Sequence, residues 1–129
     1  MRATRRGDPA APQAVDRLEQ VLRSGVAEFY AGDGQLDYAS IALTRLREQA
    51  GDRAAALAAS RYRHYFIGWQ PFLATSLREE GRLAAALGDG EGAIRAYEHH
   101  LALRYDPEPA IRASTDSVRA EVARLKAAR

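Results

Sequence analysis

Cysteine is absent from this 129-residue chain, and lysine, methionine and tryptophan each occur once. Without cysteine the protein has no disulfide, no thiol nucleophile and no thiolate metal site, and nothing indicates an oxidising compartment. No apolar run approaches the roughly 18 residues of a membrane span. The basic start of the chain, residues 1–6, is not followed by the apolar stretch of a secretory signal. We therefore expect a cytoplasmic protein that does not enter the membrane.

An excess of charge of one sign is also lacking. The chain has 19 basic and 17 acidic residues, so its net charge is only +2. Residues 1–70 carry 10 basic and 8 acidic groups, and residues 71–129 carry 9 of each. This balance argues against nucleic-acid binding, which normally leaves a strongly basic patch. A helical nucleic-acid binder stays the less favoured alternative, and it requires one shared face for a set of five arginines. These are Arg45, Arg47, Arg53, Arg61 and Arg63.

No segment alternates apolar and polar residues as a half-buried strand does, whereas apolar residues recur at spacings of three and four. This pattern predicts an all-α fold of about six helices after a flexible lead-in over residues 1–13. The expected helices cover residues 14–31, 36–50, 53–66, 71–87, 91–104 and 108–126. Short breaks between them predict antiparallel neighbours. Among the residues expected to face inward are Tyr38 and Leu87, and Asp106 is the expected N-cap of the last helix.

An internal repeat is visible when Gly51-Asp52 is aligned with Gly88-Asp89, an offset of 37 residues. Ala56 then matches Ala93, where a small residue suits a close helix crossing. The period is near the ~34 residues of a known helix–turn–helix repeat. We expect one helical domain over residues 14–129. It would contain a degenerate unit at about 37–70, a better unit at about 73–107, and a final solvating helix at about 108–127.

The better unit resembles the tetratricopeptide repeat family. The matching residues are Gly81, the Gly88-Asp89 turn, Ala93, Tyr97 and Leu101. His100 departs from the pattern, because the family prefers alanine there, and Pro107 comes two residues late. Residues 72–125 also resemble the C-terminal end of larger bacterial regulators. The resemblance implies a right-handed stack of helix pairs that holds another protein and carries no chemistry.

The resemblance further implies a peptide-binding groove lined by the first helix of each pair. The residues placed there are Arg45, Thr75, Arg78 and Arg82. Arg78 and Arg82 lie at i, i+4 on one helical face and could bind the carboxylates of an acidic peptide or the C-terminus of a partner protein. The plainer interpretation is a solvated face on which these arginines pair with neighbouring glutamates.

Half of the ten aromatic residues lie within eleven positions, at Tyr62, Tyr65, Phe66, Trp69 and Phe72. Such a cluster is most simply the core between two repeat units. Alternatively it is an exposed patch that docks a partner or a second copy, because Trp and Tyr favour interfaces. In that case the protein would be an oligomerisation or packing tail of a regulator whose active domain is absent.

Catalytic and metal-binding patterns find little support. His99 and His100 are adjacent and diverge by about 100° on a helix, whereas helical metal pairs use i, i+4 spacing. Glu79 and Glu80 diverge in the same way and do not form an acid/base pair. We therefore expect a non-enzymatic interaction module without metal or cofactor, whose partner is another protein or peptide.

Overall fold

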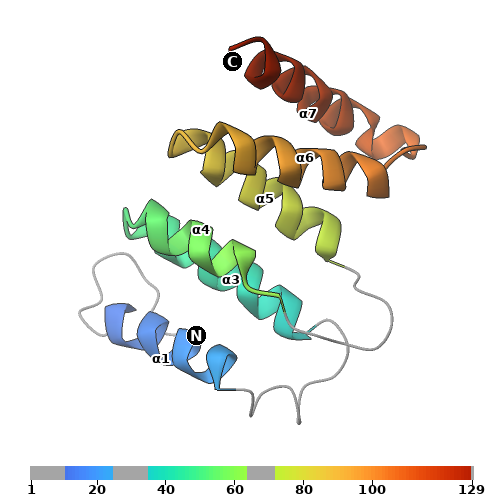
Figure 1. The fold of residues 1–129 in the computed structure, drawn as a ribbon. Coiled ribbons are helices and arrows are strands. Elements are labelled where there is room, and N and C mark those ends of the chain that lie inside the picture. Colours follow the sequence, from blue (N-terminus) through green and yellow to red (C-terminus); the bar gives the residue numbers. More distant parts are fainter. Residues whose placement is uncertain (1–10, 25–34, 64–71, 129) are drawn as a thin grey trace. The chain divides into compact units, whose positions relative to one another are not determined.

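Every element in the described part of the chain is a helix (Figure 1). The computed structural model describes residues 11–24, 35–63 and 72–128. The helices are α1 (Ala11–Arg23), α3 (Gln35–Gln49), α4 (Arg53–Arg61), α5 (Leu73–Ala86), α6 (Gly90–Leu103) and α7 (Pro109–Ala127). The predicted all-α class and number of helices are thus confirmed. The chain divides into two compact units, residues 1–70 and 71–129. No helix in the described ranges is both long and apolar enough to cross a membrane.

The first helix differs from its predicted bounds at both ends. It begins at Ala11, inside the predicted lead-in, with Pro12 in its first turn, where a missing N–H costs no helical hydrogen bond. It ends at Arg23 rather than near residue 31. Ser24 lies in a turn, and its hydroxyl donates to the Val21 carbonyl at 2.8 Å. Residues 25–34 lie outside the described ranges.

Helix α4 is also shorter than predicted. It ends at Arg61, whereas the apolar spacing predicted an end near residue 66. The next residue, Tyr62, has an extended backbone with φ −72° and ψ 121°. The guanidinium of Arg63 then turns back and donates to the Ser60 carbonyl, one of the last carbonyls of the helix. This contact closes α4 in a way that periodicity alone does not indicate.

The same Gly-Asp turn joins α3 to α4 and α5 to α6. Gly51 and Gly88 have positive φ, 87° and 81°, a conformation that side chains disfavour. The following aspartate donates its N–H to the carbonyl five residues back, at 3.0 Å from Asp52 and 2.9 Å from Asp89. Its carboxylate then accepts the N–H three residues on and caps the next helix. The alignment of the two turns from sequence is therefore matched by equal local structure.

The hydrogen bond of the Asp89 cap is expected to stabilise the start of α6. Its Oδ1 accepts the Gly92 N–H at 2.8 Å, at the positive end of the α6 dipole. We expect Asp89→Ala to lower the free energy of unfolding by about 1 kcal/mol, as measured by urea unfolding followed by circular dichroism. Asp89→Asn keeps a capping oxygen and is expected to lower the free energy of unfolding by only a few tenths of a kcal/mol. Equal losses in the two variants would show that the cap bond is not the cause.

Helices α5, α6 and α7 pack in sequence order within the second unit (Figure 1). Ala93, Ile94 and Tyr97 of α6 are buried, as the periodicity predicts. Leu87 is 45% exposed, so its predicted inward position is wrong. It follows the last residue of α5 and so lies outside the packed face of that helix.

The predicted N-cap of α7 is also wrong. The helix begins at Pro109, after Glu108, and it has no side-chain hydrogen bond at its N-terminus. Proline fixes φ for a first helical residue and needs no N–H partner there. The helix start is therefore set by Pro109 rather than by Asp106.

Candidate functional site

An open, largely apolar groove lies between α1 and α3 in the first unit. Its volume is about 400 Å³. The lining residues are Ala14, Val15 and Leu18 of α1 with Tyr38, Ile41, Ala42, Arg45 and Leu46 of α3. On α3, positions 38, 41, 42 and 45 follow the i, i+3, i+4, i+7 spacing of one helical face. The groove is thus built from two facing helical stripes within one compact unit.

Two large side chains border this groove on α3. Tyr38 is 62% exposed, so its predicted inward position is wrong. It lines the groove together with Ile41, which is buried. Arg45 is exposed two helical turns further on, about 10 Å along the axis. One end of the groove therefore carries an aromatic ring and the other a cation.

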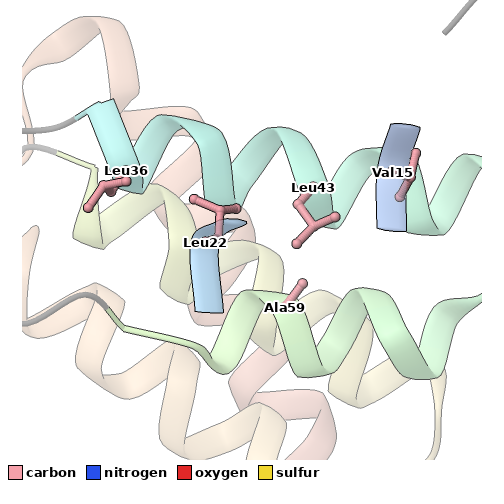
Figure 2. Packing of buried hydrophobic residues seen from close by; sticks show 5 residues of the cluster. All are labelled: Val15, Leu22, Leu36, Leu43 and Ala59. Atoms are coloured by element: carbon pink, nitrogen blue, oxygen red, sulfur yellow. The ribbon is translucent and has the colours of Figure 1, made fainter. Parts of the chain in front are cut away.

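The α1 wall is held in place by an apolar cluster beside the groove. Val15 and Leu22 of α1 meet Leu36 and Leu43 of α3 and Ala59 of α4 (Figure 2). All five are at most 7% exposed, so the wall is packed on the α3–α4 hairpin and is not a loose segment. Burial of these side chains supplies most of the attraction between α1 and the hairpin.

Arg47 adds a charged link between α1 and α3. Its Nη2 lies 2.6 Å from a carboxylate oxygen of Glu19 and 2.8 Å from one of Asp16. Burial alone would raise the pKa of Glu19, but the hydrogen bonds from Arg47 and Arg23 outweigh it and lower that pKa. No local sequence pattern indicates this cluster. It joins residues 28 and 31 positions apart, so only the tertiary arrangement brings them together.

Arg45 differs from Arg47 in its ion-pair partners. Residues two apart on a helix point about 200° from one another, so the two arginines cannot share a face. Among the described residues, Arg45 forms no ion pair and no side-chain hydrogen bond. The groove therefore has an exposed guanidinium at its edge while the acids of α1 are engaged by Arg47. The five arginines of the nucleic-acid alternative do not lie on a single face.

The other predicted groove residues lie on α5 in the second unit. Thr75 is half-buried, and Arg78 is exposed. Arg82 binds Glu79 one turn away, with Nη2 at 2.9 Å from Oε2. For Arg82 the plainer interpretation, an arginine paired with a neighbouring glutamate, therefore fits. Arg45 belongs to the first unit, whereas Thr75, Arg78 and Arg82 belong to the second.

The predicted aromatic interface is described only in part. Tyr62 is half-buried in the first unit, with the guanidinium carbon of Arg23 at 5.3 Å from its ring centre. Phe72 is half-buried at the N-cap position of α5 in the second unit. Tyr65, Phe66 and Trp69 lie outside the described residues. The choice between a core and an interface for this cluster stays a prediction.

The two described histidines differ sharply in environment. His99 is exposed, whereas His100 is 6% exposed, and its Nδ1 lies 2.7 Å from the Ala74 carbonyl oxygen. A carbonyl only accepts, so Nδ1 carries the hydrogen and donates it. Within residues 11–24, 35–63 and 72–128, no group of three or more His, Asp or Glu side chains could hold a metal ion.

Comparison with known proteins adds no further assignment to this geometry. No family model matches the chain, and neither a curated protein nor a solved structure matches it.

Proposed function

We propose that this protein is a non-enzymatic protein–protein interaction module, which binds a peptide or a helix in the groove between α1 and α3. The observation that carries the proposal is the groove itself, with its apolar floor, an aromatic ring at one end and a guanidinium at the other. Aromatic and arginine side chains are the residue types that dominate binding energy at interfaces. The tetratricopeptide resemblance supports the same class of function, and we expect the module to act in the cytoplasm.

Tyr38 and Tyr105 offer a matched pair of variants for the test. Tyr38 is at the groove and 62% exposed, whereas Tyr105 is in the second unit and 85% exposed. Truncation of either exposed ring is expected to leave the fold intact. Peptides would be selected from a displayed random library on the wild-type protein and then measured against Tyr38→Ala and Tyr105→Ala by calorimetry.

We expect Tyr38→Ala to weaken the selected peptides by at least about tenfold, because a ring at the edge of a groove commonly contributes more than 1 kcal/mol to binding. Tyr105→Ala is expected to leave their affinity unchanged. Nuclear magnetic resonance shifts on peptide addition should map to α1 and α3. Selected peptides that bind all three proteins equally would place the binding surface elsewhere and overturn the proposal.

A further inference from the structure

Helix α1 itself shows what kind of segment the surface of α3 holds. It is amphipathic, and it places Val15 and Leu22 against the α3–α4 hairpin. The same helix places Asp16 and Glu19 against Arg47, at 2.8 and 2.6 Å. The unit thus holds a helix by a combination of apolar burial and acid–arginine pairing, within one polypeptide.

The groove presents the same combination to a second helix. Its floor is apolar, with Leu18 on the α1 side and Ile41 and Ala42 on the α3 side. Its cation is Arg45, which is exposed and forms no ion pair with any residue that the structure describes. An occupant would cover the apolar floor and supply the carboxylate that Arg45 lacks. An acidic partner is favoured over a basic one, because a basic helix would place like charges together.

We infer that the occupant of the groove is an amphipathic helix of a partner protein, which bears an acidic side chain against Arg45 and apolar side chains toward Tyr38. This inference rests on the proposed function and names its partner class. A helix fits because the two walls are themselves helices, so a third can pack its ridges into the furrow between them. Tyr38 and Arg45 lie seven residues apart, which places the acid and the apolar anchor of the partner at i and i+7.

The test uses a defined pair of probes and a charge swap. One probe is an alanine-based helical peptide with leucines at i, i+3 and i+4 and a glutamate at i+7. The other carries arginine in place of that glutamate. Each is titrated into the wild-type protein, into Arg45→Glu and into Tyr38→Ala by calorimetry. Arg53→Glu is the matched control, since Arg53 is an exposed arginine at the start of α4 and does not line the groove.

We expect the wild-type protein to prefer the glutamate peptide by about tenfold, and Arg45→Glu to reverse that preference. Arg53→Glu is expected to behave as the wild type. If Tyr38→Ala weakens binding but Arg45→Glu does not change the preference between the peptides, the inference of an acidic partner is wrong and the proposed function stands. If neither variant changes binding, both the inference and the proposed function are wrong. Failure of the glutamate peptide to bind the wild-type protein would overturn the partner class, whatever a displayed library selects.

Discussion

Gly81→Ala is expected to destabilise the second unit by about 2 kcal/mol, although the same change in an ordinary helix interior stabilises by about 1 kcal/mol. A Cβ at position 81 would lie 2.5 Å from Cδ1 and Cε1 of the Tyr97 ring, and 2.9 Å from Cγ. Real carbon contacts do not approach so closely. Tyr97 is only 6% exposed, so its ring has no solvent space into which it can turn. The strain must therefore separate α5 from α6 or distort both.

Gly90→Ala is the matched control for this prediction. Gly90 is also helical, and a Cβ there would meet nothing within 4 Å. We expect that variant to be neutral or slightly more stable. Urea unfolding gives the overall free energy, and hydrogen exchange of peptides from α5 and α6, with those of α3 and α4 as reference, locates the loss.

A double-mutant cycle identifies the Tyr97 ring as the cause. In a Tyr97→Leu background the ring is absent, so the penalty of Gly81→Ala should shrink by more than 1 kcal/mol. If the penalty is the same in both backgrounds, the ring is not the obstacle. A stabilising Gly81→Ala in the wild-type protein would contradict the close packing of α5 on α6.

The fold was predictable where local chemistry decides it. The Gly-Asp pairs at 51–52 and 88–89 dictate a helix end and a helix start together, because only glycine readily adopts the positive φ and aspartate is a strong cap. These turns are where the predicted and observed bounds agree best. The ends of α1 and α4 were missed because apolar spacing shows which face of a helix is buried and does not show where the helix stops.

The candidate site was predictable only in part. Arg45 was named from the resemblance, but its neighbours in the groove come from α1, which no local pattern connects to α3. Tyr38 was taken for a core residue because its spacing from Ile41 fits an inward face. Helical periodicity gives the direction of a side chain and does not show whether another helix covers it. Tyr38 and Leu18 became candidate binding residues only once the packing of α1 was known.

Acid is expected to weaken the second unit through His100. Burial lowers the pKa of this imidazole below its ordinary value of 6.5; the bond to the Ala74 carbonyl opposes that shift, and the positive charges of Arg104 and Arg78 add to it. The unfolded protein therefore takes up a proton at a higher pH than the folded protein does. By linkage, stability is complete well above pH 6.5 and falls as the pH drops below that value. It levels off once the pH is below the folded pKa.

The measurement is urea unfolding between pH 7.5 and pH 5, at intervals of about half a unit, with a slope of at most about 1.4 kcal/mol per pH unit for a single proton. The pKa values of Glu19 and Glu121 are lowered from 4.5. The stability that their carboxylates contribute is therefore lost mainly below this pH range. His100→Gln keeps an amide donor for Ala74 but cannot titrate, so we expect it to flatten the slope. His99→Gln, at the exposed neighbouring position, should keep the wild-type slope. Equal slopes in the wild type and His100→Gln would show that the buried imidazole is not the acid-sensitive group. The contact between α5 and α6 would then not depend on a neutral histidine.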